Sequence, residues 1–395
     1  MDLNIPIAYV IQELGIGGRE SQLLELVKGI DRKRFDPIVI YYRELNILNT
    51  WNRIEYEKLG ISMIKLKQRC TLDPMLIFNL NRLFKDKRIR IVHCWGFNAN
   101  FHGSIAAKIV NDTPIIITSI LGKDPGQSRF PKSIAVMINR MLSRITDLVM
   151  TNCKAGIQLL CEKGTDRSKI KCIYSGLDLT RFRVFEDRDS VRRELGICPS
   201  DKVVGFVGRL APVKDLRMLL SAAVEVLGEL PNTRFLIVGD GPLRESLKVF
   251  ARNLGIASNT LFLGNRRDVS KLLLSLDICV VPSLWENCSN TILESMAMGR
   301  PVIAFTVGGN PEIIANGVTR FLVKFRSVTD LAESIIWALK HDDCLREIRY
   351  AAKAEITKKF ALDKMIKDTQ KSYITLLNQH RLSYNRISAD RLQTF

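Results

Sequence analysis

The sequence has no long apolar stretch and no segment that resembles an export signal. Its longest apolar runs, such as residues 114–121, are much shorter than the roughly 20 apolar residues that span a bilayer. We therefore predict no transmembrane helix. The first residues pass directly into the strand-like residues 5–10, without a basic region or a small-residue cleavage site before them. A cytoplasmic location is the expectation.

Paired cysteines and clustered histidines are also missing. The nine cysteines are odd in number, widely spaced and without a CxxC pair, and the chain has only four histidines. We therefore predict neither a disulfide scaffold nor a zinc module. The 24 glycines and 13 prolines are too few for a fibrous or low-complexity chain.

What the chain does have is an ordinary globular composition. Of its 395 residues, 46% are hydrophobic and 25% are charged. Since this length is about two to three times that of a usual domain, two domains are expected.

The charge is strongly positive and unevenly distributed. Lysine and arginine number 59 against 41 acidic residues, and residues 1–185 contribute +12 of the net +18. Such a surface suits phosphate-rich partners such as nucleic acid, anionic lipid headgroups or nucleotide-linked substrates. Because the basic residues are spread out, a merely solubilising surface is an equal alternative.

Short apolar runs alternate with longer helical patterns along the chain, which is typical of parallel sheets joined by crossover helices. In the first half we predict strands at residues 5–10, 37–41, 61–66, 89–94, 114–120, 147–151 and 171–174. In the second half we predict strands at residues 203–207, 234–238, 260–263, 277–281, 301–305 and 321–323. The predicted fold class is α/β, with two doubly wound, Rossmann-like domains.

The charged residues 182–201, which end where a new strand begins, are interpreted as the domain linker. The expected division is a first domain of residues 1–185, a second of residues 186–361, and a helix and tail of residues 362–395. This last helix has Met365, Thr369, Tyr373 and Leu376 on one face. It could leave the second domain and pack on the first.

A glycine-rich loop follows the first predicted strand of each half of the chain. Gly17 and Gly18 lie between a strand and a helix, where backbone amides can approach an anion, although a plain tight turn is the alternative. In the second half, Arg209 ends a strand and Lys214 precedes a helix, so both cations could converge on a diphosphate. Two surface cations beside a turn are the alternative. Gly239 begins another glycine loop at the same edge.

The stretch 282–294 carries two carboxylates around a predicted helix start. Glu286 lies in the loop, and Glu294 lies about one turn into a helix that begins near Ser289 or Asn290. A carboxylate can accept hydrogen bonds from both hydroxyls of a ribose, and the amides between the glutamates can bind phosphate or sugar oxygens. For Glu294 the alternative is a first-turn acid that complements the helix dipole.

Five motifs in order resemble the retaining glycosyltransferases of family 4, also called glycosyl transferases group 1, which have the GT-B fold. They are GGRE at 17–20, GRLxPxK at 208–214, GDGP at 239–242, the two glutamates with seven residues between them, and GGNPEII at 308–314. The GLD at 176–178 with Arg181 and Phe182 also resembles the end of that family's first domain. The resemblance implies two domains facing across a cleft, with the nucleotide-sugar donor mainly on the second and the acceptor mainly on the first.

The resemblance also implies roles for individual residues. Arg209 and Lys214 would neutralise the donor diphosphate, Glu286 would contact the donor sugar, and Glu294 would hold the ribose. Backbone donors would come from Asn287, Cys288, Ser289, Asn290 and Thr291. Gly17, Gly18 and Gly239 would approach the donor phosphates, and Asn265 and Arg266 would lie near the base.

The chain departs from the family pattern at three places. Residues 119–122 lack the histidine that members often carry there, so His93 is the candidate on the acceptor side, with a structural histidine as the equal alternative. Asn287, Cys288 and Ser289 replace the common Gly-Phe-Pro, and Arg320 replaces a usual glycine.

The favoured function is transfer of a sugar to an acceptor hydroxyl with retention of configuration, without a metal or other cofactor. The acceptor would be a glycan or a lipid-linked molecule of polysaccharide, lipopolysaccharide or glycolipid synthesis, and the basic first domain could attach to the inner face of an anionic membrane. A GT-B nucleotide-sugar epimerase and a non-enzymatic basic module are the alternatives. No nucleic-acid partner is expected, because no recognition motif is present. Neither the base, the sugar nor the acceptor can be named from the sequence.

Overall fold

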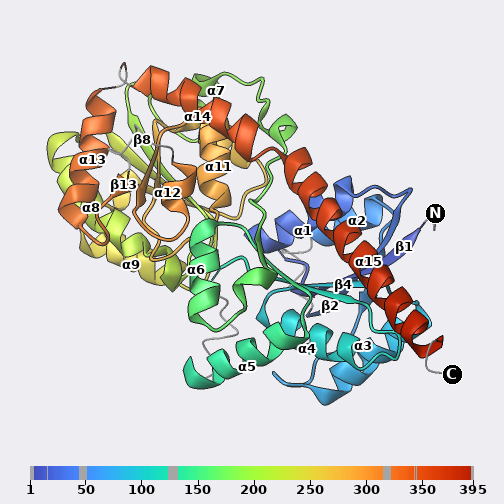
Figure 1. Cartoon of the computed structure of the whole chain (residues 1–395). Coiled ribbons are helices and arrows are strands. Elements are labelled where there is room, and N and C mark those ends of the chain that lie inside the picture. The colour runs from blue at the N-terminus through green and yellow to red at the C-terminus, as the bar shows by residue number, and fades with distance from the viewer. Residues whose placement is uncertain are drawn as a thin grey trace. The chain divides into compact units, whose positions relative to one another are not determined.

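The computed structural model describes residues 4–15, 17–43, 51–122, 132–314, 322–341, 343 and 345–392. The chain forms two compact units (Figure 1). The first comprises residues 1–176 and 363–395, and the second comprises residues 177–362.

A seven-stranded parallel sheet forms the centre of the first unit, in the order β3-β2-β1-β4-β5-β6-β7. The strands are β1 (Ile5–Glu13), β2 (Phe35–Arg43), β3 (Ser62–Lys65), β4 (Ile91–Trp95), β5 (Ile115–Ser119), β6 (Leu148–Thr151) and β7 (Ile170–Cys172). All seven predicted strands are confirmed. The order reverses between β1 and β4, as in doubly wound folds.

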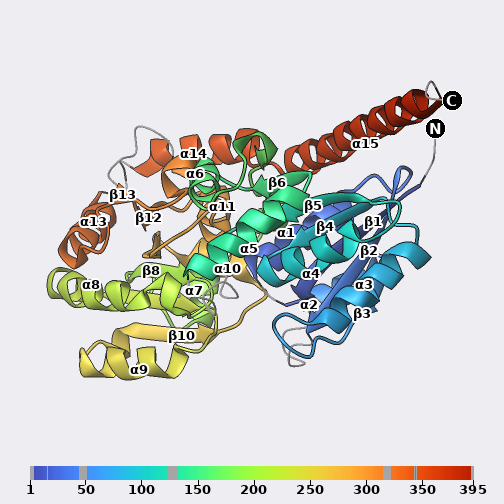
Figure 2. The same ribbon diagram turned by 60° about the horizontal axis from the view of Figure 1, so that its bottom comes forward.

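Helices cover both faces of this sheet. They are α1 (Gly18–Gly29), α2 (Trp51–Lys58), α3 (Pro74–Asp86), α4 (Phe97–Lys108), α5 (Lys132–Ile145), α6 (Lys154–Glu162) and α15 (Leu362–Leu392). Because parallel crossovers are right-handed, α3 to α6 lie on one face and α1 and α2 lie on the other (Figures 1 and 2). The α3 side packs Leu76, Leu80 and Phe84 against β-strand residues such as Val10 and Val92.

The last helix, α15, belongs to the first unit, which confirms that it returns to that domain. Its buried side chains repeat at helical spacing: Met365, Ile366, Thr369, Ser372 and Tyr373. The Gln370 side chain also accepts a hydrogen bond from the backbone N–H of Asp31 at 2.8 Å. The sequence pattern indicates only that apolar residues share one face of this helix. Burial of that face in the first unit determines where the helix packs.

The second unit has a six-stranded parallel sheet in the order β10-β9-β8-β11-β12-β13. The strands are β8 (Lys202–Val207), β9 (Thr233–Val238), β10 (Thr260–Gly264), β11 (Ile278–Val281), β12 (Val302–Phe305) and β13 (Leu322–Val323). These confirm the six predicted strands, except that Phe321, like Arg320, lies outside the described residues.

Eight α-helices are described in this unit. They are α7 (Arg188–Glu194), α8 (Leu216–Glu229), α9 (Arg244–Asn253), α10 (Val269–Ser275), α11 (Asn290–Ala297), α12 (Asn310–Ile313), α13 (Val328–Lys340) and α14 (Leu345–Lys359). Helix α8 packs beside α13, while α7 packs beside α10, and α11 beside α14. Apolar residues of α8 and α13, among them Leu219 and Leu331, form one core with Phe235 and Phe305 of the strands.

The segment interpreted as a linker contains α7, which is anchored in the second unit. Arg192 is buried, and its guanidinium donates to the backbone oxygen of Ser275 and, at 2.8 Å, to the Asp277 carboxylate. Burial alone would raise the pKa of Asp277, but the charges of Arg188 and Arg192 outweigh it and lower that pKa. Two arginines of the segment interpreted as a linker, Arg188 and Arg192, thus form an ionic cluster with Asp277 of the second unit.

Candidate functional site

Four loops meet at the carboxyl edge of the second sheet. They follow β8, β9, β11 and β12 and cover residues 208–215, 239–243, 282–289 and 306–309. In open α/β sheets, ligands bind at this edge, where the helix N-termini also point. The four second-unit motifs recognised in the sequence lie on these loops or on the helices that follow them.

Backbone hydrogen bonds join these loops to one another. The N–H of Leu210 donates to the oxygen of Asp240 at 2.9 Å, and the N–H of Leu284 donates to the oxygen of Val213 at 2.8 Å. The N–H of Gly309 donates to the oxygen of Glu286 at 2.9 Å. The loops therefore form one connected surface, and the backbone of Glu286 is fixed by its neighbour.

Two glycines permit this close approach. A Cβ atom at Gly239 would lie 1.9 Å from the backbone oxygen of Gly208, and one at Gly308 would lie 1.9 Å from the backbone oxygen of Glu286. Both residues also have positive φ angles, 127° and 51°. Gly239, which the sequence placed near the donor, therefore has a packing role that accounts for its identity.

Lys214, Glu286 and Ser283 form the charged centre of this surface. The Lys214 ammonium is ion-paired with Oε1 of Glu286, and both side chains are largely buried. The hydroxyl of Ser283, a fully buried residue, donates to the same carboxylate oxygen at 2.7 Å. A cation and a carboxylate predicted for one ligand are thus in direct contact.

Sequence reasoning missed Ser283. Its position, directly after the β11 loop begins and three residues before Glu286, is the signal that could have identified it. A short side chain at that spacing can reach back to the carboxylate across one turn of the loop.

The loop 287–289 leads into the N-terminus of α11. Ser289 is the N-cap residue, and the hydroxyl of Thr291 donates to the backbone oxygen of Val207 at 2.9 Å. The side chain of Asn287 accepts a hydrogen bond from Trp285 at 2.8 Å. Cys288 is buried and Asn290 is the first residue of the helix. The bond from Thr291 ties the positive end of the helix dipole to the end of β8, beside Arg209.

Glu294 lies in the second turn of α11, because the helix begins at Asn290 and has no acidic residue in its first turn. The alternative of a first-turn acid that complements the dipole is therefore wrong. The side chain is only partly exposed, and burial raises the pKa of Glu294 to about 7 while the charge of Arg181 opposes that rise. A carboxyl group that titrates near neutrality is available both as a carboxylate and as an acid.

The remaining second-unit residues are more exposed. Arg209 is exposed directly after Gly208. Asn265 is exposed at the end of β10, and Arg266 is paired with Asp268 at 2.5 and 2.8 Å. This pairing holds the Arg266 guanidinium on its own loop, while the contact between Gly239 and Gly264 keeps that loop beside the site.

In the first unit, the glycine loop has the predicted placement between β1 and α1. Gly17 is the N-cap of α1 in extended conformation, and Gly18 is the first residue of the helix. Arg19 and the buried Glu20 form an ion pair at 3.3 Å in the first turn. A helix N-terminus and glycine backbone are present there, as phosphate binding requires.

His93 is a core residue. It is fully buried, with Nδ1 2.7 Å from the hydroxyl of Tyr373 and Nε2 2.8 Å from the hydroxyl of Ser119. Burial lowers the pKa of His93 to about 3. Both ring nitrogens are thus used inside the protein, so the structural alternative describes His93 and an acceptor-side role does not fit its position.

Among the described residues, no group of three or more His, Cys, Asp and Glu side chains comes together in a way that could hold a metal ion. No helix in the described parts of the chain is both long and apolar enough to cross a bilayer.

Comparison with protein-family models gives two matches, which follow one another along the chain. Residues 16–181 match the model described as Glycosyltransferase Family 4, and residues 187–355 match the model described as Glycosyl transferases group 1.

Curated proteins give matches of similar kind. The chain is 31% identical to "Uncharacterized glycosyltransferase MJ1607" of Methanocaldococcus jannaschii over 53% of this chain and 55% of the relative. It is 32% identical to the D-inositol 3-phosphate glycosyltransferase of Nocardia farcinica over 58% and 52%, respectively. The chain thus spans about half the length of these two relatives. The Escherichia coli UDP-Gal:alpha-D-GlcNAc-diphosphoundecaprenol alpha-1,3-galactosyltransferase is 25% identical over 80% of this chain and 82% of the relative.

Solved structures share the fold over nearly the whole chain. Anabaena HepE in complex with UDP-glucose has a TM-score of 0.80 at 23% identity, covering 94% of this chain and 100% of that one. A glycosyltransferase from Rickettsia africae has a TM-score of 0.80 at 21% identity, covering 94% and 99%. At these identities the likeness shows the fold.

Proposed function

The chain belongs to glycosyltransferase family 4, the glycosyl transferases group 1, with the GT-B fold, and from this membership we propose that it transfers a sugar from a nucleoside-diphosphate donor to an acceptor hydroxyl with retention of configuration. The donor diphosphate binds at the carboxyl edge of the second sheet. The observation that carries the proposal is the contact of Lys214 with Glu286, supported by Ser283, beside the N-terminus of α11.

The diphosphate is held by positive charge. Arg209 and Lys214 neutralise it, and the first-turn amides of α11 add the partial charge of the helix dipole. Since charge grows on the diphosphate as it leaves, these groups stabilise the transition state more than the ground state. Donor binding draws Lys214 toward phosphate, while Ser283 keeps Glu286 in place.

The two glutamates take different parts of the donor. Glu286, in the loop, contacts the sugar, and Glu294, one helical turn further into the protein, accepts hydrogen bonds from the ribose hydroxyls. The environment of Glu294 supports this role. Hydrogen bonds from hydroxyl groups stabilise a partly desolvated carboxylate more than they stabilise a carboxylate in water. Amides of residues 287–291 bind the oxygens between these ends.

Bond changes in the proposed reaction balance without a protein nucleophile. The bond between the anomeric carbon and the diphosphate oxygen breaks, and the acceptor oxygen forms a bond to the same face of that carbon. The acceptor proton passes to an oxygen of the leaving diphosphate. The side chains bind and orient the reactants, and Arg209 and Lys214 supply the neutralising charge.

For the acceptor, we propose a glycan or lipid-linked molecule of cell-surface polysaccharide, lipopolysaccharide or glycolipid synthesis. The excess of basic residues in the first half of the chain supports an acceptor that bears phosphate or lies at an anionic membrane. The E. coli relative is named for an acceptor of this kind, a diphosphoundecaprenol-linked sugar.

A thermal-shift panel of UDP, GDP, ADP and their sugars tests the donor, because binding raises the melting temperature by an amount that grows with the ratio of ligand concentration to its Kd. With the best donor, the product's anomeric configuration is then read by NMR in the presence of EDTA. Retention in the chelator is expected. An inverted product contradicts the mechanism, and activity that disappears in EDTA and returns with manganese or magnesium contradicts metal-free catalysis.

A further inference from the structure

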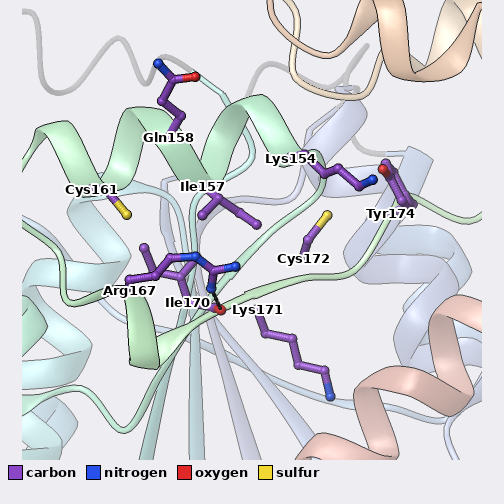
Figure 3. Close-up of a pocket in the computed structure, with 9 residues that line it drawn as sticks. All are labelled: Lys154, Ile157, Gln158, Cys161, Arg167, Ile170, Lys171, Cys172 and Tyr174. Carbon is purple, nitrogen blue, oxygen red and sulfur yellow. Dashed lines mark hydrogen bonds between the residues drawn. The ribbon is translucent and has the colours of Figure 1, made fainter.

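A groove between α6 and the edge strand β7 belongs to the first unit, whereas the donor loops belong to the second. Its volume is about 690 Å³, which is within the range of small-molecule sites. Figure 3 shows α6 along one side of the groove and β7 with the chain after it along the other. Lys154, Ile157 and Cys161 line it from α6 at helical spacing, and Ile170 and Cys172 line it from the strand.

The floor of the groove is apolar. Alternation along β7 turns Ile170 and Cys172 toward α6, and sends Lys171 to the opposite face, where its ammonium lies 2.8 Å from the hydroxyl of Ser372 in α15. Ile157 faces the two strand residues from the helix. Two aliphatic side chains and a thiol therefore form the floor, while Gln158 and Tyr174 also line the groove.

The rim of the groove is cationic. Lys154 is the first residue of α6, and Arg167 lies in the short 3-10 helix Arg167–Lys169. A hydrogen bond of 3.2 Å from the Arg167 guanidinium to the backbone oxygen of Ile170 holds that charge over the floor (Figure 3). None of the residues that line the groove is acidic. The rim therefore presents two cations to an anionic group.

The helix α5, which the 3-10 helix contacts, has an exposed apolar surface. The ammonium of Lys169 donates to the backbone oxygens of Ser143 and Thr146, so the 3-10 helix is fastened to the end of α5. On its outer face, α5 exposes Ile134, Met137 and Met141 to 40%, 64% and 43%. These three large apolar side chains form one exposed helical stripe on α5.

We propose that this groove binds a single-chain lipid phosphate. Lys154 and Arg167 match the charge of the phosphate, and the chain lies over Ile157, Ile170 and Cys172. The inference goes beyond the proposed transfer reaction, because binding here needs neither the donor nor the loops of the second unit.

Cysteine alkylation of the whole protein tests the proposal without any activity assay. Cys161 is exposed and Cys172 is half-exposed in the groove, while the exposed Cys70 and Cys198 lie elsewhere and serve as internal controls. Farnesyl phosphate should slow alkylation of Cys161 and Cys172 by about tenfold or more, and leave both controls unchanged, because a bound chain covers the thiols. Mass spectrometry of the peptides measures each thiol separately.

Two further probes separate the sources of phosphate. Inorganic phosphate and phosphatidylglycerol vesicles should give little protection, the first because it has no chain and the second because two chains do not fit one floor. Equal protection by inorganic phosphate would overturn the lipid part of the proposal. Protection by vesicles alone would make this face a membrane surface instead, and no protection by any probe would overturn the site.

Matched variants test the residues. Lys154→Glu and Ile157→Trp should each weaken protection by farnesyl phosphate about tenfold or more, by repelling the phosphate and by filling the floor. Lys108→Glu, the same charge reversal at an exposed residue at the end of α4, should leave it unchanged. An equal loss in Lys154→Glu and Lys108→Glu would show a general charge effect and contradict the site, and full protection in Ile157→Trp would contradict the proposed floor. Donor binding should be normal in each variant, so that failure here is distinguishable from failure of the transferase proposal.

Discussion

The two sheets of this protein have the same strand order and different chemistry at their polar residues. From one edge, β3-β2-β1-β4-β5-β6 in the first unit corresponds to β10-β9-β8-β11-β12-β13 in the second. In the second unit, the loop after β11 presents Glu286 to Lys214. In the first, the corresponding β4 turns His93 inward, where it meets Ser119 and Tyr373.

The comparison shows that the shared topology determines where the carboxyl edge of each sheet lies. The residues of the loops at that edge determine its chemistry. Paired polar groups in the second unit lie where a ligand can replace one partner. The polar groups of the first unit satisfy one another inside the core, and so stabilise the docking of α15 instead. Variants in the two clusters should therefore differ in kind: one set should change catalysis and the other stability.

The largest effect is expected at the cations. Lys214→Ala and Arg209→Ala should each lower turnover about a hundredfold or more while the protein stays folded, because each removes charge stabilisation of the leaving diphosphate. Steady-state kinetics with the best donor measures this. Near-normal turnover in both purified variants would remove them from the mechanism.

A smaller effect is expected at Glu294. Glu294→Gln should weaken binding of the bare nucleoside diphosphate by roughly 1–3 kcal/mol, because the charged acceptor of the ribose hydrogen bonds is lost. Titration calorimetry of the variant and wild type gives both affinities.

The pKa of about 7 for Glu294 adds a pH signature. Wild-type affinity should rise from about pH 6 to about pH 8 relative to the glutamine variant, as the carboxyl ionises. Stability should move the other way. A raised pKa means that the fold favours the protonated acid, so this contribution is present below the ordinary value of 4.5 and is lost as pH rises through about 7. If the difference in affinity between wild type and Glu294→Gln is the same at pH 6 and at pH 8, Glu294 does not contact the ribose.

Ser283 tests whether the buried hydroxyl acts through Glu286. Ser283→Ala should lower turnover about tenfold in the wild type, and hardly at all in a Glu286→Gln background, because the hydrogen bond it supplies serves that carboxylate. The control is Ser275→Ala, which removes an equally buried hydroxyl bonded at 2.7 Å to the backbone oxygen of Leu272. Equal losses in both backgrounds would mean that Ser283 acts independently of Glu286.

The smallest effect on catalysis is expected in the first unit. Tyr373→Phe should cost about 1–2 kcal/mol of unfolding free energy and leave turnover unchanged, since it removes the hydroxyl beside His93. Because burial holds the pKa of His93 near 3, its neutral form stabilises the fold above the ordinary value of 6.5, and this contribution is lost as pH falls toward 3. Denaturant curves at several pH values check both statements. A loss of turnover at full stability would return this cluster to the acceptor site.

Much of the fold could be predicted from the sequence. Apolar runs in parallel sheets are buried on both faces, which is why all the predicted strands were found, with ends that differ by a few residues. The family resemblance is likewise confirmed by the two matching models. Helix α7 was missed because its seven residues are mostly charged, and only Asp277, far along the chain, shows that Arg188 and Arg192 point toward a partner.

Contacts between distant residues account for the rest. His93 is 280 positions from Tyr373, and Lys214 is 72 positions from Glu286. No local pattern specifies such pairs, so the sequence left His93 open between two roles and assigned Lys214 and Glu286 to different parts of one ligand. The contact of Ser283 with Glu286 was within reach, because the two residues are three apart.

The most direct test of the central claim is the affinity of the best nucleoside diphosphate for wild type, Lys214→Ala and Lys248→Ala, measured by calorimetry. Lys248 is the matched control, since it is also a second-unit lysine in an ion pair, with Glu245 at 2.9 Å. We predict that the wild type and Lys248→Ala bind the diphosphate at one site with equal affinity. In Lys214→Ala the binding free energy should be weaker by about 1.5–3 kcal/mol. Equal affinity in all three proteins would contradict a diphosphate site at the carboxyl edge of the second sheet.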